Sequence, residues 1–157
     1  MQQLKQMYRT NYTGEQVITE LHYTGGDWEY EVETVPNSVF ATHTTTQAVA
    51  IGNGESRLGF DLNLIATHKA GFGGANRLQS YGCNALYRDF APDFLIASGD
   101  GIVKEISGSR YCAEHIVYAN SDVLLKYPNQ FYLIPQNIFY DSGALAAYMA
   151  CFDGHEK

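Results

Sequence analysis

The first part of the chain alternates between hydrophobic and polar positions. In the run 28–34, Trp, Tyr and Val side chains alternate with glutamates, and this period of two predicts a strand with one polar face. The run 17–23 is similarly rich in β-branched and aromatic residues, and Gly25 and Gly26 between the two runs are typical of a hairpin turn. With a further strand over 4–12, residues 1–46 are predicted to form a small antiparallel β-hairpin or meander, closed by Pro36.

From residue 47 onward, short apolar runs alternate with helix-like segments. The run Ala48–Ile51 is continuously apolar, which is typical of a strand buried on both faces. Further strands are predicted to end at Cys83 and to cover 94–97, 115–118 and 131–134. Repeated strand–helix units predict an α/β fold, with a Rossmann-like, mainly parallel sheet and helices on both faces. We expect residues 47–157 to form this second domain.

Two helices and one loop are predicted within this domain. A short helix is expected over 102–106, and another after Asp141, with Asp141 or Ser142 as its N-cap. Apolar residues recur at helical spacing in the second one and predict one buried face: Leu145, Tyr148, Met149 and Phe152. The glycine-rich segment 70–76 is either a lid over a site or an ordinary loop.

Composition narrows the function classes. The chain has 157 residues, about one domain, and 45% of them are hydrophobic, which excludes a disordered tail. A formal net charge of −7 argues against binding to a nucleic-acid polymer, because such proteins neutralise phosphates with Lys and Arg. The sequence has neither a membrane-span-length apolar run nor a secretion signal at its start. We therefore expect a cytoplasmic protein, with a phage origin in a bacterial host as one interpretation.

Cysteine and histidine spacing predicts no metal site. The three cysteines form no Cys-x-x-Cys pair, and the five histidines show no metal-ligand spacing. The cysteines are interpreted as free buried thiols in a reducing compartment. The alternative is a nucleophilic Cys112 with His115 as its base.

Three motifs could carry chemistry. The first follows the strand 48–51 and reads Gly52-Asn53-Gly54-Glu55-Ser56-Arg57. Glycines after a strand let an anion approach free backbone N–H groups, and Arg57 could balance phosphate charge. A dinucleotide fingerprint would need a glycine where Arg57 stands, so the alternative is a plain tight turn.

The second motif places Asn84 just beyond the carboxyl end of the next strand, a rim where ligands bind in open α/β sheets. Its amide can read a base or ribose edge. Arg88 and Asp89 follow, and their simplest role is a surface salt bridge with each other. The third motif is Ser142 and Gly143 at the start of the last helix, where the first N–H groups favour an anion or simply require an N-cap.

Together these motifs resemble the small Rossmann-like family of bacterial sialyltransferases that use CMP-sialic acid. The likeness covers 48–157 and implies that the three elements hold a nucleotide. A looser likeness to pterin pyrophosphokinase-like domains rests on the first motif, and the chain is also similar to small proteins of phages that infect marine bacteria. The sialyltransferase match implies these nucleotide-binding residues: Gly52, Asn53, Gly54, Ser56, Asn84, Ser142 and Gly143.

The chain departs from that family at its end. In the sialyltransferases, the Ser-Gly helix leads into another buried strand and later to a catalytic His, whereas this sequence ends at 153–157. The resemblance therefore assigns no catalytic base, and we expect His155 to be solvated. A missing sheet edge could also come from a partner subunit.

Two functions remain open. One is a nucleotide-binding domain resembling a nucleotide-sugar-dependent glycosyltransferase, with its activity undecided and its catalytic part lacking. The other is a non-catalytic, phage-type structural or regulatory protein that forms homo-oligomers through a sheet edge or the N-terminal segment. The expected ligand is a nucleotide or nucleotide-sugar, without a required metal but compatible with a Mg²⁺ that the nucleotide carries. A third alternative is an incomplete version of a longer enzyme.

Overall fold

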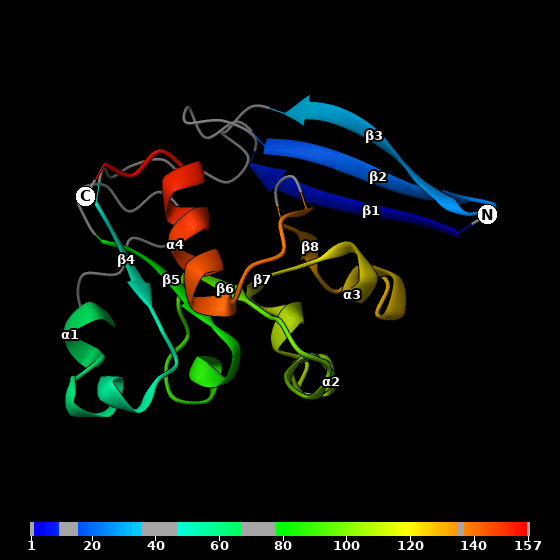
Figure 1. Cartoon of the computed structure of the whole chain (residues 1–157). Coiled ribbons are helices and arrows are strands. Elements are labelled where there is room, and N and C mark those ends of the chain that lie inside the picture. Colours follow the sequence, from blue (N-terminus) through cyan, green and yellow to red (C-terminus); the bar gives the residue numbers. More distant parts are fainter. Residues whose placement is uncertain (1, 10–15, 36–46, 67–77, 135–136, 157) are drawn as a thin grey trace.

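The chain contains two separate β-sheets (Figure 1). The computed structural model describes residues 2–9, 16–35, 47–66, 78–134 and 137–156. The glycine-rich segment 70–76 and Pro36, which is expected to close the first unit, lie outside these residues. No helix in the described part of the chain is long and apolar enough to cross a membrane.

The first sheet has three antiparallel strands in the order β1-β2-β3. These strands are β1 (Gln2–Arg9), β2 (Gln16–Thr24) and β3 (Asp27–Val35). The turn between β2 and β3 contains Gly25 with φ +64° and Gly26 with φ +138°, conformations that L side chains disfavour. Strand β1 also contacts β8, at one edge of the second sheet.

The second sheet has five strands, all parallel, and confirms the predicted α/β class. Its order is β4-β5-β6-β7-β8, so each strand lies beside the next one in the sequence. The strands are β4 (Ala48–Ile51), β5 (Gln79–Cys83), β6 (Phe94–Ile96), β7 (Ile116–Ala119) and β8 (Tyr132–Leu133).

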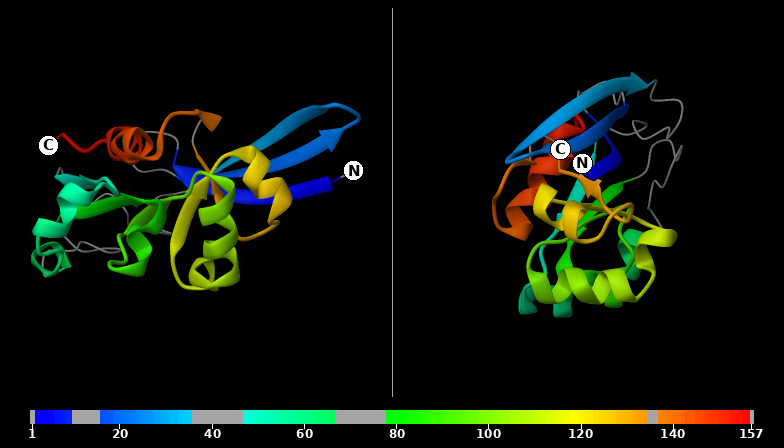
Figure 2. Two further views of the ribbon diagram at one scale, coloured as in Figure 1. Left: turned by 60° about the horizontal axis from the view of Figure 1, so that its bottom comes forward. Right: turned by 90° about the vertical axis from the view of Figure 1, so that its right-hand side faces the viewer.

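This strand order determines where the helices lie. Right-handed crossovers between strands that follow one another in a single direction all fall on the same face. The connections contain η2 (Glu55–Gly59), α1 (Asn63–Ala66), η3 (Asn84–Arg88), α2 (Asp100–Gly108), η4 (Tyr111–Ala113) and α3 (Ser121–Lys126). Among the described helices, α4 (Ser142–Phe152), after the last strand, is the one that packs on the opposite face (Figure 2, left).

Side-chain alternation within the sheet separates two cores. Ile51, Leu95 and Val117 occupy one register row, and their face packs against the connecting helices. Tyr81 and Phe94 in the neighbouring row pack against α4, with ring centroids 5.1 Å apart. The sheet is therefore covered on both faces, by the connecting helices on one side and by α4 on the other.

The expectation that Ala48–Ile51 is buried on both faces is wrong. Strand β4 is an edge strand, Ala50 is exposed, and only Ile51 is fully buried. An apolar run of small residues does not distinguish a central strand from an edge strand. The order of the described strands also shows no reversal, so it provides no switch-point crevice of the doubly wound kind.

The apolar face of α4 differs in part from the predicted one. The buried residues are Leu145, Ala146, Met149 and Ala150, whereas Tyr148 and Phe152 are only half-buried. Small alanines let the helix approach the sheet closely. The rings of Tyr148 and Phe152 lie to one side, with their centroids 6.0 Å apart.

The end of α4 is tied to the start of β5. The Tyr81 hydroxyl donates to the buried Asp153 carboxylate, and Nε2 of His155 lies 3.0 Å from that hydroxyl and 2.8 Å from Oε1 of Gln79. The expectation that His155 is solvated is therefore wrong, because it joins a buried polar network.

Candidate functional site

The predicted site residues lie at the carboxyl ends of adjacent strands and at the start of α4. Asn84 follows β5 directly, as predicted, and takes a left-handed φ of +50° that Asn tolerates. Its Nδ2 donates to Oγ of Ser142 at 3.0 Å, and its Oδ1 accepts from the backbone N–H of Ser98 at 2.9 Å. The structure thus brings Asn84 and Ser142 together, in a contact that ties three segments of the rim.

A second asparagine pair ties the same rim beyond β7. Asn120 is 7% exposed and donates to Oδ1 of Asn137 at 3.1 Å and to the carbonyl of Ile138 at 2.8 Å. Asn137 also bonds the backbone and hydroxyl of Ser121. Together with the Asn84 contacts, these residues form what we call the tied rim: Asn84, Ser98, Asn120, Ser121, Asn137 and Ser142.

At the start of α4, the anion position is partly filled from within the chain. Oδ1 of Asp141 accepts from the N–H of Ala144 at 3.0 Å, which confirms Asp141 as the N-cap. A carboxylate already stabilises the positive end of this helix. Ser142 and Gly143 are therefore placed beside an occupied cap.

Asn53 and Arg57 lie together at the end of β4, on the edge of the sheet. Nε of Arg57 donates to Oδ1 of Asn53 at 3.1 Å, and its guanidinium pairs with Asp89 at 2.8 Å. The Arg57 side chain is 15% exposed and that of Asp89 is 56% exposed. The ion pair therefore has one well-placed, largely buried cation and one carboxylate that solvent reaches.

The interpretation of Arg88 and Asp89 as a pair is wrong. Both guanidinium and carboxylate have partners elsewhere: Arg88 bonds Glu105 of α2, and Asp89 bonds Arg57. Arg88 is the last residue of η3 and Asp89 is its C-cap, and their side chains reach different elements. The Arg88 bond and a 2.6 Å bond from Tyr87 hold the pKa of Glu105 at about 2 instead of 4.5.

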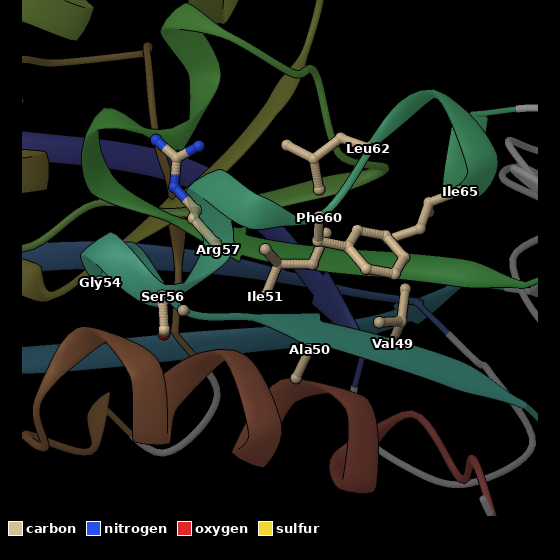
Figure 3. Close-up of a pocket in the computed structure, with 10 residues that line it drawn as sticks. Val49, Ala50, Ile51, Gly54, Ser56, Arg57, Phe60, Leu62 and Ile65 are labelled. Atoms are coloured by element: carbon tan, nitrogen blue, oxygen red, sulfur yellow. The ribbon is translucent and has the colours of Figure 1, made fainter.

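Two cavities meet at the β4 turn. The first, of about 310 Å³, is mainly apolar, and Figure 3 shows the Phe60 ring above β4 beside Val49 and Ile65. The second, of about 290 Å³, is lined largely by polar and charged groups, among them Asn53 and both arginines of this region. Gly54 and Arg57 line both cavities, so the two adjoin.

The glycines at the β4 turn have no internal reason to be glycine. Gly54 has φ −75° and ψ 163°, which any residue adopts, and a Cβ there would meet only Oγ of Ser56 at 3.9 Å. A Cβ at Gly52 would meet nothing within 4 Å. Gly82 is the opposite case, since its Cβ would lie 2.3 Å from Leu86. The open backbone at 52–54 therefore suits a group that approaches from outside.

The structure does not place all predicted residues in one cavity. Asn53, Gly54 and Arg57 line the charged cavity, while Gly52, Gly54, Ser56 and Arg57 line the apolar one. Neither cavity is lined by Asn84, Ser142 or Gly143. We call the predicted residues that line either cavity, together with Asp89, the open edge: Gly52, Asn53, Gly54, Ser56, Arg57, Arg88 and Asp89.

The alternative of a reactive cysteine finds no support. Burial raises the pKa of the Cys112 thiol to about 11, so it stays protonated at neutral pH. Cys83 is buried, but Cys151 is exposed, contrary to the expectation of buried thiols throughout. Within the described ranges, no group of three or more His, Cys, Asp or Glu is arranged to hold a metal ion.

Sequence reasoning missed several of the contacts that shape the site. The Arg57–Asp89 pair spans two connections, and the Asn120–Asn137 contact joins β7 to the segment after β8. No spacing rule connects such positions. The one available signal was the Asn-Ser step at 120–121, which is typical of a helix start.

No known protein family, characterised protein or solved structure matches this chain. The comparisons therefore do not place it among the sialyltransferases, and the supported part of that likeness is a five-stranded parallel α/β sheet.

Proposed function

We propose that the open edge binds a nucleotide, either a mononucleotide or a nucleotide-sugar. The observation that carries the proposal is the meeting of an apolar and a charged cavity at Gly54 and Arg57. A nucleotide has the same division, with a flat base at one end and phosphates at the other.

The apolar cavity suits the base. Phe60 is 50% exposed and lies beside aliphatic side chains of β4 and α1. Aromatic side chains stack on any base with little sequence preference. We therefore assign the base to the Phe60 side of Gly54.

The charged cavity suits the phosphates. Arg57 and Arg88 both line it, and since Glu105 already neutralises Arg88, Arg57 is the cation assigned to the phosphate. The bare backbone of Gly54 lets a phosphate oxygen come close. Arg57 is held by the exposed Asp89 in the structure. A phosphate would replace that carboxylate, exchanging one charge-assisted contact for another.

Transfer chemistry is the finer part of the proposal. Glu55 and Asp89 are the carboxylates that line the charged cavity, and a carboxylate can take a proton from an acceptor hydroxyl. Glycosyl transfer from a nucleotide-sugar would use one of them as its base. Nucleotide binding is the primary claim and does not depend on this step.

Titration of the full chain with CMP, UMP, AMP and GMP, followed by NMR of the protein, tests the proposal. We expect saturable shifts at 52–60, and Arg57→Gln should weaken binding about tenfold or more, because a charge-assisted contact is lost. Cytidine and inorganic phosphate serve as half-ligands that should bind more weakly than CMP.

Asp89→Asn is the matched control. It removes the competing carboxylate without touching the arginine, so affinity should stay the same or rise by up to about fivefold. The absence of saturable shifts with every nucleotide at millimolar concentration would overturn the proposal.

A second candidate function is self-association in a non-catalytic role. It is favoured by the edge position of β4 together with exposed apolar side chains beside it: Leu58 at 71%, Phe60 at 50% and Leu64 at 59%. Exposed apolar patches and unpaired strand edges both attract other chains. Light scattering decides this candidate, because a strict monomer at high protein concentration excludes it.

A further inference from the structure

A third cavity lies between η3 and the turn that joins α2 to β7. Its volume is about 610 Å³, a size typical of small-molecule sites. Tyr87 and Arg88 form one side, and residues between 109 and 115 form the other. Arg88 also lines the charged cavity of the open edge, so the two cavities lie on either side of it.

One wall of this cavity is aromatic. The rings of Tyr111 and His115 stack with their centroids 4.1 Å apart and their planes 17° apart. The Tyr87 ring lies 5.0 Å from that of Tyr111, and its hydroxyl is fixed by Glu105 at 2.6 Å. Adjacent rings held in this way offer an apolar, polarisable surface to a flat ligand.

Arg110 occupies an unusual backbone position beside this wall. Its φ is +64°, in the left-handed region just after α2, where Gly or Asn is the ordinary residue. The side chain is exposed and makes no ion pair within the described part of the chain. A left-handed arginine with an uncommitted charge at a cavity is a backbone outlier of the kind that accompanies binding sites.

Glu114 supplies the opposite charge to the same cavity. It is exposed and also makes no ion pair among the described residues, including with Arg110. Arg88 is different, because Glu105 already neutralises it. The cavity thus offers one uncommitted cation and one uncommitted carboxylate next to an aromatic wall.

We propose that this cavity binds a small zwitterion with a flat ring, the chemistry of a free aromatic amino acid. The ligand carboxylate pairs with Arg110, and its ammonium group pairs with Glu114. The ring lies against the Tyr111 wall. This proposal does not rest on the nucleotide function, since its contacts are separate from the open edge apart from the neutralised Arg88.

NMR titration of the full chain with L-tryptophan, in the absence of nucleotide, is the direct experiment. We expect saturable shifts at Arg110 and Tyr111 with millimolar affinity. L-alanine, which keeps both charges but lacks the ring, should bind at least about tenfold more weakly, because ring burial supplies the apolar contribution. Equal binding of the two ligands, or no saturable shift with tryptophan, overturns the proposal.

Two charge variants test the assignment of each ligand end. Arg110→Gln should weaken binding of tryptophan about fivefold but leave tryptophan amide unaffected, because the amide has no carboxylate to lose. Glu114→Gln should weaken binding of tryptophan by a similar factor and leave N-acetyltryptophan unaffected. Equal losses for the free and blocked ligands contradict the assigned orientation.

Arg110→Gly separates binding from folding. Glycine relieves the left-handed backbone, so we expect the melting temperature to stay the same or rise by ~2–4 °C while tryptophan binding falls. Asn129→Gly, at φ +63° and outside this cavity, is the matched control and should leave binding unchanged. A stability loss with Arg110→Gly would assign the arginine a structural role and overturn its role in binding.

Discussion

The tied rim and the open edge both lie at the carboxyl ends of parallel strands, yet they use polar residues differently. On the tied rim, asparagine amides bond side chains and backbone of neighbouring segments, as Asn120 does with Asn137 and Ile138. On the open edge, glycines have no internal requirement, and Arg57 is held by a carboxylate that is 56% exposed.

The difference teaches how to separate structural from ligand-binding polar residues in one fold. A polar group whose partners are all internal stabilises the fold, and its loss is read in the free energy of unfolding. A group beside a cavity, with a partner that solvent can replace, is available to a ligand. The two regions should therefore respond to mutation in different measurements.

Gly82→Ala should give the largest effect on stability. Its Cβ would lie 2.3 Å from Cδ2 of Leu86 and 3.0 Å from Cγ of Pro92, so the packing beside β5 must shift. Overpacking of this kind costs about 1–3 kcal/mol of the free energy of unfolding. Denaturant unfolding measures it, and Gly101→Ala, where a Cβ meets open space, should show no loss. Equal stability of the two variants contradicts the close packing at Gly82.

Asn120→Ala should give the next largest loss of stability. It removes a buried amide that donates two hydrogen bonds and leaves their acceptors without it, at a cost of about 2 kcal/mol. Asn53→Ala on the open edge removes only the contact to Arg57 and should change the free energy of unfolding by less than about 0.5 kcal/mol. Thermal unfolding of both variants measures this difference. Similar losses of stability in the two variants would mean that the tied rim and the open edge do not differ.

Much of the parallel sheet could be predicted because its signals are local. Strand β4 has the predicted bounds, and β5 ends at Cys83 as predicted. Strands β6, β7 and β8 differ from the predictions by one residue at one or both ends. Runs of apolar residues separated by turns and helices carry this information along the chain.

Burial and partner choice could not be predicted because they depend on distant residues. The pattern of Ala48–Ile51 is the same for a central strand and for an edge strand, and only the strand order decides. Proximity in the sequence predicts a salt bridge between Arg88 and Asp89, whereas the fold gives them Glu105 and Arg57 as partners. Likewise, His155 stands near the end of the chain but meets Gln79 at the start of β5.

Gly54→Ala should leave stability intact and affect binding. Its backbone angles suit any residue, so alanine should be neutral or stabilise by about 0.4–1 kcal/mol. If a phosphate approaches this backbone, the added methyl group should weaken nucleotide binding about tenfold. Gly59→Ala, also in open space, is the control for binding. If Gly54→Ala binds CMP with unchanged affinity, the phosphate does not bind at this turn.

Glu105→Gln should give the smallest effect on stability, and the size of this effect depends on pH. The carboxylate has a folded-state pKa of about 2 against an ordinary value of 4.5, first because of its hydrogen bond to Arg88 and then because of the one from Tyr87. A depressed pKa stabilises the fold above pH 4.5, and this contribution is lost as the pH falls towards 2. Because the Arg88 and Glu105 side chains are 55% and 40% exposed, solvent screens the pair and the effect is modest. The difference in melting temperature between wild type and Glu105→Gln should therefore shrink from pH 6 to pH 2. Glu114 makes no ion pair among the described residues, so Glu114→Gln is the control and should show no such trend. A constant difference across this range would mean that Glu105 acts through packing, and would make the contact between η3 and α2 resemble the tied rim.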